Sequence, residues 1–119
     1  MGYNVVDLDS IEPAGPGGMV RFVRRELGAT AFGLNHFTLP PHTEGHEHDE
    51  TASGQAEVVI VLQGSGTLKV DGTEIPLHAG RFVRLDPASR RLPVAGSDGR
   101  TFVAVGSPRE TPSVPRGPF

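Results

Sequence analysis

Histidines and acidic residues gather in one short part of the sequence. Three of the five histidines, His42, His46 and His48, lie within seven residues, and Glu57 opens the apolar segment that follows. Side chains alternate along an extended chain, so His46 and His48 point to the same side. If the strand that begins at Glu57 pairs antiparallel with the histidine segment, its carboxylate meets both imidazoles. Two imidazoles and one carboxylate suit Fe(II), Mn, Ni or Zn and leave coordination positions open for a substrate.

Each of these residues also has a plain structural interpretation. His46 and His48 could stand on a solvent-exposed loop, and Glu57 could be the solvated end of a strand. His42, in the turn before the pair, is either an additional ligand or a loop histidine. His36 lies on a predicted strand face, where it is either a hydrogen-bonded interior histidine or a group that contacts a substrate. The sequence leaves these alternatives open.

The elements that must position these residues are short strands. Apolar and β-branched segments recur every eight to twelve residues and are separated by glycine- or proline-containing turns, which is typical of an all-β sandwich or barrel. Asp71-Gly72 predicts a tight hairpin, residues 63–66 predict a turn, and residues 19–26 fit either a strand or a short helix. The remaining predicted strands cover residues 30–39, 57–62, 67–70, 73–77, 81–85, 90–94 and 100–105.

Length and composition narrow the class of protein. A chain of 119 residues makes one domain, which we divide into an N-terminal extension or edge strand (1–18), a barrel (19–106) and a proline-rich C-terminal tail (107–119). The net charge of −3 gives no reason to expect nucleic acid or an anionic membrane surface. There is no cysteine and no apolar run long enough to cross a bilayer. We therefore expect a soluble cytoplasmic protein.

The histidine segment and the strand after it resemble the first motif of the cupin superfamily, G-x5-H-x-H-x3,4-E-x6-G. The matching positions are His46, His48, Glu57 and Gly64. The leading glycine is not at its usual spacing, and the gap before Glu57 is longer than usual, as if "DETASGQA" were inserted. The resemblance implies an all-β fold, a double-stranded β-helix (jelly-roll) barrel, with a divalent metal (Fe, Mn, Ni or Zn) held by His46, His48 and Glu57. His42 is then a further candidate ligand.

The second cupin motif, G-x5-P-x-G-x2-H-x3-N, is only partly matched. It aligns from Gly80, with Asp86 and Ala88 at the usual proline and glycine positions and Arg91 at the position of the fourth ligand, a histidine. Arginine cannot act as a metal ligand, but inside a barrel its planar guanidinium binds carboxylate or phosphate. Neighbouring residues on a strand face opposite ways, so one of Arg90 and Arg91 faces the interior, and the alignment favours Arg91.

Three functions follow from the resemblance. The first is a metal-dependent enzyme, such as a dioxygenase, isomerase or cyclase, in which Arg91 and His36 contact a small anionic substrate. The second is a non-catalytic ligand-binding or sensing barrel with weak metal binding or none. The third is a structural barrel whose histidines have no chemical role. The resemblance also implies a homodimer, while the sequence gives no sign of a nucleic-acid or membrane partner.

Overall fold

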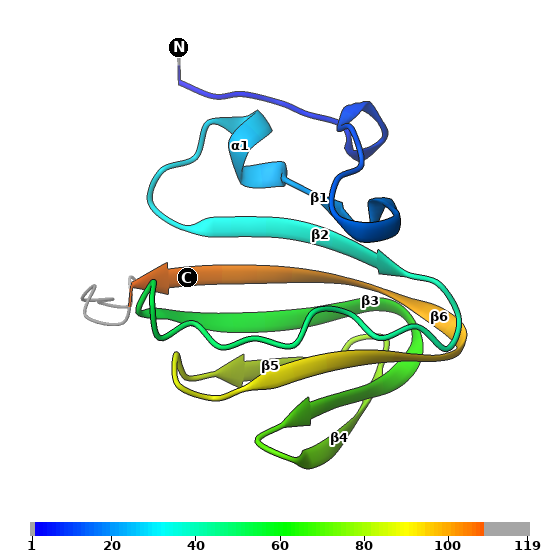
Figure 1. Ribbon diagram of the computed structural model, residues 1–119. Helices are drawn as coiled ribbons and strands as arrows, with labels where there is room; N and C mark the ends of the chain where they lie inside the picture. Colours follow the sequence, from blue (N-terminus) through cyan, green and yellow to red (C-terminus); the bar gives the residue numbers. More distant parts are fainter. Residues whose placement is uncertain (1, 109–119) are drawn as a thin grey trace.

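The protein is built almost entirely from antiparallel strands (Figure 1). The structure is a computed structural model that describes residues 2–108. The sheet order is β1-β2-β6-β3-β4, and β5 pairs with β3, which confirms the predicted all-β barrel. The elements are the 3-10 helices Leu8–Ser10 and Pro16–Gly18, β1 (Val20–Arg21), α1 (Val23–Leu27), β2 (Gly33–Leu39), β3 (Gln55–Val70), β4 (Thr73–His78), β5 (Phe82–Leu85) and β6 (Arg91–Pro108).

Two long strands, β3 and β6, run through the barrel and pair along most of their length. The turn predicted at residues 63–66 is wrong as a chain reversal, and so is the break between the predicted strands 90–94 and 100–105, because both segments continue within a strand. The glycines are needed for another reason. Gly64 has a φ of 88° and Gly66 a φ of 138°, and a Cβ at either position would collide with the backbone of β6. The two strands therefore approach each other closely only because these positions carry no side chain.

The register between β3 and β6 shifts at this close approach. Gly64 pairs with Arg100, whereas Gly66 pairs with Ala95, so β6 carries extra residues between the two pairs. Such an irregularity changes which residues face the interior. On β6 the buried positions are odd-numbered from Arg91 to Ala95 and even-numbered from Arg100 to Ala104. The shift thus turns both Arg91 and Arg100 inward from a single strand.

The ends of the described chain differ in part from expectation. Residues 19–26 contain both of the predicted alternatives, the two-residue strand β1 and the start of the five-residue helix α1. β6 extends to Pro108 and pairs Ser107 with Ala56, so it includes the first two residues of the predicted tail. Residues 109–119 of that tail lie outside the described part of the chain. No helix within residues 2–108 is long and apolar enough to span a membrane.

The hydrophobic core lies between the inner faces of the strands. Phe37 of β2 stacks on Phe102 of β6, with ring centroids 4.8 Å apart, a favourable contact between aromatic rings. The predicted hairpin at Asp71-Gly72 joins β3 to β4, and its two residues have φ values of 49° and 84°, as a type I′ turn requires. The buried cluster contains Leu39, Val59, Val61, Leu68, Leu77, Leu85, Ala95 and Phe102.

His36 is buried on β2, at 7 % exposure, between its register partners Arg21 of β1 and Val103 of β6. Its Nδ1 atom has no hydrogen-bond partner among the described residues. Burial, with a smaller effect of the Arg21 charge, lowers the pKa of His36 below its ordinary value. Burial therefore disfavours the protonated form of this imidazole in the folded protein.

The close approach of β3 and β6 predicts that Gly64→Ala strongly destabilises the fold. Gly80→Ala is a matched control, because Gly80 has nearly the same φ, 86°, but open space around it. Positive φ alone costs about 1–3 kcal/mol for a residue with a side chain. We expect Gly64→Ala to lower the free energy of unfolding by at least roughly 2 kcal/mol more than Gly80→Ala does, because the backbones of β3 and β6 must also move apart. Urea unfolding measures both values, and equal losses would contradict the close approach.

The burial of His36 predicts a pH dependence of stability. Above its ordinary pKa of about 6.5 the side chain is neutral in both states and contributes no pH dependence. As the pH is lowered below that value, His36 takes up a proton in the unfolded state before it does so in the folded state. The free energy of unfolding therefore decreases as the pH decreases. His36→Gln removes this contribution. The stability of the variant relative to the unmodified protein should therefore increase as the pH is lowered from 7.5 to 5. Urea midpoints that keep a constant difference across this range would refute the assignment.

Candidate metal and anion site

A cavity of about 180 Å³ lies inside the barrel. Its wall is mostly apolar and comes from β2, β3, β4, β6, the residues before β1 and the histidine-containing segment between β2 and β3. An apolar cavity with a few polar groups directed into it is the usual form of a small-molecule site. The polar lining side chains are His46, His48, Glu57, Arg91 and Arg100.

The histidine segment pairs with β6, and not with the strand of Glu57 as the sequence suggested. The backbone N–H of His48 donates to the carbonyl of Arg91 at 3.0 Å, and the N–H of Arg91 donates back at 2.8 Å. A further bridge joins Glu44 to Val94. Glu57 instead lies on β3, where its register partners are Leu85 and Gly106. His48 therefore lies close to Glu57 without being its partner in a strand ladder.

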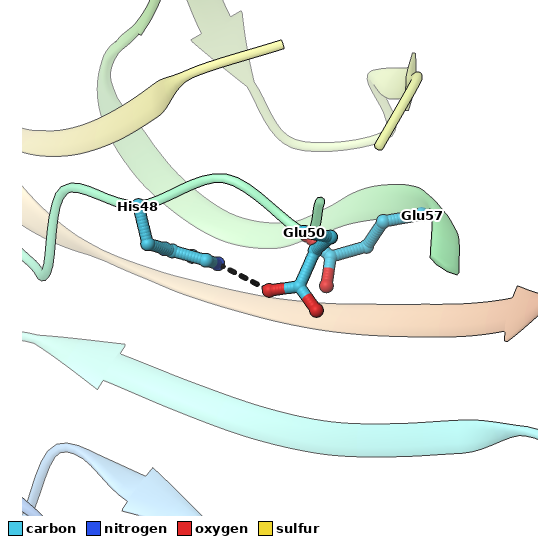
Figure 2. Close-up of side chains that lie close together, drawn as sticks. All are labelled: His48, Glu50 and Glu57. Carbon is cyan, nitrogen blue, oxygen red and sulfur yellow. Dashed lines mark ion pairs between the residues drawn. The ribbon is translucent and has the colours of Figure 1, made fainter. Parts of the chain in front are cut away.

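His48, Glu50 and Glu57 form a compact group of potential ligands (Figure 2), whose ligand atoms all lie within 4.8 Å of one another. Figure 2 shows Glu50 between the other two, with its carboxylate Oε2 atom 3.1 Å from His48 Nε2. Two carboxylates and one imidazole form a mixed oxygen and nitrogen ligand set that suits a divalent transition-metal ion. The site predicted from sequence thus contains His48 and Glu57, and the structure adds Glu50.

Glu50 is held in place by the turn that follows it. The Ser53 hydroxyl donates to Glu50 Oε1 at 2.7 Å, and the N–H of Glu50 donates to the carbonyl of Pro87 at 2.8 Å. Asp49 Oδ1 accepts hydrogen bonds from the N–H and hydroxyl of Thr51, which also lowers the pKa of Asp49. The sequence carried a signal for Glu50, because the spacing of two that groups His46 with His48 extends to it.

The atoms of His48 fit a bound cation. Its Nδ1 lies 3.2 Å from the carbonyl oxygen of His46, and a carbonyl can only accept, so Nδ1 carries a hydrogen. In the neutral ring Nε2 then presents its lone pair toward Glu50, so a proton or a cation must lie between these two acceptors. Ligands bound at about 2.0–2.2 Å around one ion lie roughly 3 Å apart, which agrees with the 3.1 Å separation.

The other two histidines of the segment are placed differently. His46 lines the cavity and stacks against His48, with ring centroids 5.6 Å apart, so the two imidazoles share a face. His46 is nevertheless not among the three closely grouped ligands. His42 has a φ of 56°, and its N–H donates to the carbonyl of Gly96. It neither lines the cavity nor joins the group of ligands, so the structure does not place it as an extra ligand.

Glu57 experiences opposing electrostatic influences. Burial raises the pKa of its carboxyl group, while the nearby Arg91 charge acts in the opposite direction. Glu50 raises that pKa further and His48 lowers it, both to a lesser degree. The nearest atoms of Arg91 and Glu57, Nε and Oε1, lie 4.0 Å apart. A buried carboxylate is costly without a cation beside it, so this corner of the cavity favours positive charge next to Glu57.

Of the two adjacent arginines, Arg91 faces the cavity and Arg90 faces outward. Arg91 is 2 % exposed, whereas the Arg90 side chain is 55 % exposed and pairs with Glu47 at 3.2 Å. One nitrogen of Arg91, Nη2, donates to the carbonyl of Asp86 at 3.2 Å. Its Nε and Nη1 atoms have no hydrogen-bond partner among residues 2–108. Arg91 thus brings unused donors to the wall beside the acidic group.

A second cavity-lining arginine, Arg100, was not predicted from the sequence. It is 2 % exposed, and Nη1 donates to the carbonyl of Thr67 at 2.9 Å. Burial lowers its pKa to about 10, which leaves it charged at neutral pH. Its inward direction depends on the register shift between β3 and β6. Local sequence gives no sign of that shift.

His36 lies outside this site, although the sequence made it a candidate for substrate contact. The cavity-lining residues of β2 are Phe37 and Leu39, and His36 is not part of the wall. The reason is the alternation of side chains along a strand, which turns His36 to the opposite face. Its burial there is structural, between β1 and β6.

Solved structures of several proteins are similar to this chain. A cupin protein from Bacteroides fragilis matches with a TM-score of 0.82 and 19 % identity, over 98 % of this chain and 92 % of that chain. A predicted oxalate decarboxylase from Thermotoga maritima matches with a TM-score of 0.70 and 21 % identity, over 87 % and 98 %. A sugar phosphate isomerase of the cupin superfamily from Silicibacter pomeroyi matches with a TM-score of 0.70 and 24 % identity, over 87 % and 75 %. These similarities show a shared fold.

Sequence comparison gives the family. No curated protein matches the sequence, but the family model described as "Cupin domain" matches residues 35–105, which is more than half of the chain. The matched region begins in β2, ends in β6 and contains the histidine segment, Glu57, Arg91 and Arg100. This protein therefore belongs to the cupin domain family.

Proposed function

We propose that this protein binds one divalent metal ion at His48, Glu50 and Glu57 and binds or converts a small anionic metabolite at Arg91. The observation that carries the proposal is the Arg91 side chain, which is 2 % exposed and has two unused donor nitrogens beside the acidic group. A buried cation with unmade hydrogen bonds is costly. An anionic ligand removes this cost by accepting those bonds.

The shape of the site supports a small ligand. The cavity of about 180 Å³ is mostly apolar, with its charged side chains directed inward, so a bound molecule is shielded from water and its ion pairs are strengthened. Two structural neighbours have names that refer to anionic small molecules, a sugar phosphate and oxalate. The small anionic ligand that we propose for this cavity is therefore of the same chemical class as the molecules in the names of those proteins.

In an enzyme, the residues around the cavity would have different roles in binding and catalysis. Arg91 would bind and orient the anionic group through Nη1, which has no hydrogen-bond partner among the described residues, while its Nε faces Glu57. The apolar wall would exclude water, and His46, stacked beside His48, is placed to contact the ligand. A metal ion at the three ligands would supply Lewis-acid polarisation of a substrate oxygen.

A non-catalytic ligand-binding or sensing barrel is the alternative, and one observation favours it. The acidic side chains already have basic partners without a metal, since His48 lies 3.1 Å from Glu50 and Arg91 lies 4.0 Å from Glu57. If His48 is protonated, the group is balanced internally. The barrel would then bind the anion through Arg91 with weak metal binding or none.

The ligand group predicts which substitutions remove the metal. The unmodified protein, loaded with Fe(II), Mn, Ni or Zn and desalted, should retain about one ion per chain for one of them. His48→Ala and Glu50→Gln should each lose most of it, because each removes one of the few protein ligands. Inductively coupled plasma mass spectrometry on tag-free protein measures the content.

Two variants serve as controls for metal binding. His42→Asn keeps a residue that tolerates the positive φ at this position, and His78→Ala changes an exposed histidine outside the site. Both should retain the metal. Retention by His48→Ala would refute the assigned ligands, and absence of metal from the unmodified protein under all four loadings would leave the metal-free barrel as the function.

The orientation of the adjacent arginines predicts that only Arg91 binds the anion. Calorimetry with inorganic phosphate and with acetate should show Arg91→Gln raising the dissociation constant roughly ten- to a hundredfold, since a hydrogen bond to a charged group contributes about 1.5–3 kcal/mol. Arg90→Gln is the matched control and should change little, because its side chain is exposed. Equal effects of the two substitutions would contradict the proposed site.

A homodimer and a cytoplasmic location remain part of the proposal. The sequence supports the second through its lack of cysteine, and the resemblance to cupins supports the first. Sedimentation of the purified full chain tests the dimer directly.

A further inference from the structure

We infer that Arg100 forms a second anion subsite in the cavity, separate from Arg91, and that the ligand is a small molecule with two anionic groups. This inference rests on the proposed binding of an anion at Arg91 and deepens it. One anionic group would lie at Arg91 beside His48, Glu50 and Glu57. The other, a carboxylate or a phosphate, would lie at Arg100.

Arg100 is a buried cation with unused hydrogen-bonding capacity. It lines the cavity, is 2 % exposed, and its Nε and Nη2 atoms have no hydrogen-bond partner among the described residues. No carboxylate within residues 2–108 forms an ion pair with it. Its pKa, lowered by burial to about 10, leaves it charged at neutral pH. A charge in this position is costly unless something of opposite sign reaches it.

The contacts that Arg100 does make leave its donors free. Nη1 is bound to the carbonyl of Thr67, and the guanidinium carbon lies 5.3 Å from the centroid of the Phe102 ring. An aromatic ring interacts with the charge of a guanidinium, but Nε and Nη2 have no acceptor among residues 2–108. Two adjacent donors of one guanidinium match the two oxygens of a carboxylate or phosphate.

The two arginines are anchored at different parts of the wall. Arg91 is held by the carbonyl of Asp86, in the turn after β5, and Arg100 by the carbonyl of Thr67 on β3. The Arg91 guanidinium also lies beside Glu57, which is ten residues before Thr67 on the same strand, β3. Separate anchors favour two anionic groups on one ligand over a single anion shared by both arginines.

The balance of charge agrees with two anionic groups. Arg91 and Arg100 are cationic, while Glu57 and the neighbouring Glu50 are acidic. With the proposed divalent ion at His48, Glu50 and Glu57, the positive charges of the two arginines and the ion exceed the negative charges of the two carboxylates by two. Two anionic groups on the ligand would balance that excess.

Matched ligand pairs test this subsite. Malonate, succinate and glutarate are each compared with the corresponding monoamide, which keeps the shape and removes one charge, and 3-phosphonopropionate replaces one carboxylate of succinate by phosphonate. Calorimetry on the unmodified full chain should show at least one diacid binding roughly tenfold or more tightly than its monoamide. Arg100→Gln should abolish that preference and leave monoamide affinity within about twofold.

The variants separate this inference from the proposed function. Arg91→Gln should weaken diacid and monoamide alike, and Arg100→Lys, which keeps the charge, should retain part of the preference for diacids. Monoamide binding that depends on Arg91, without any preference for diacids, would refute the second subsite and leave the proposed function standing. If Arg100→Gln weakened the binding of diacid and monoamide equally, both arginines would bind the same anionic group, and the second subsite would also be refuted. If no acid in the series binds the unmodified protein, both proposals fail.

A measurement on the unmodified protein avoids the risk that Arg100→Gln fails to fold. The Nε–H signals of Arg91 and Arg100, assigned by nuclear magnetic resonance, report each guanidinium directly. The preferred diacid should shift both signals, and its monoamide should shift that of Arg91 alone. A diacid that shifts only the Arg91 signal would overturn the inference. Tighter binding of 3-phosphonopropionate than of succinate would identify the second group as phosphate-like, and the reverse order as a carboxylate.

Discussion

The close approach of β3 to β6 is the constraint on which the interior depends. Gly64 and Gly66 have no side chain to hold the backbones apart, and the register between the strands shifts between them. Without the shift, strict alternation along β6 would turn either Arg91 or Arg100 away from the cavity. The glycines of the first cupin-like motif and their neighbours therefore shape the charge of the site although they contribute no chemical group to it.

The acidic groups lie together at one corner of the cavity, with Arg91 beside them. His48, Glu50 and Glu57 gather at one corner, where the histidine segment pairs with the start of β6. Arg91 stands beside Glu57 as the partner of a buried carboxylate, and in the proposed function it is also the donor to the ligand. A metal ion in the acidic corner would compete with Arg91 for Glu57 and release the guanidinium toward the anion. Metal binding and anion binding would then support each other.

Local patterns predicted the fold better than they predicted the site. The all-β class and the Asp71-Gly72 turn depend on neighbouring residues, and both were correct because alternation and turn chemistry are local, whereas the breaks predicted within β3 and β6 were wrong. The pair His46 and His48 was read correctly as sharing a face. Glu50 was missed although it continues the same spacing. Arg100 could not be predicted as a cavity residue, because its direction depends on a register shift between β3 and β6. The parts of β6 on either side of this shift were predicted to be two separate strands.

Keeping two arginines with unmade hydrogen bonds in the barrel has a thermodynamic consequence. Each buried polar atom without a hydrogen-bond partner lowers the stability of the ligand-free fold by about 1–3 kcal/mol, and five such side-chain atoms lie on His36, Arg91 and Arg100 among the described residues. A sequence selected for stability alone would place apolar side chains at both arginine positions. Retaining the charges makes sense if the folded state is occupied by an anion for much of the time, since a ligand that binds only the folded state stabilises it. The cost to the empty barrel is thus an argument against a purely structural protein.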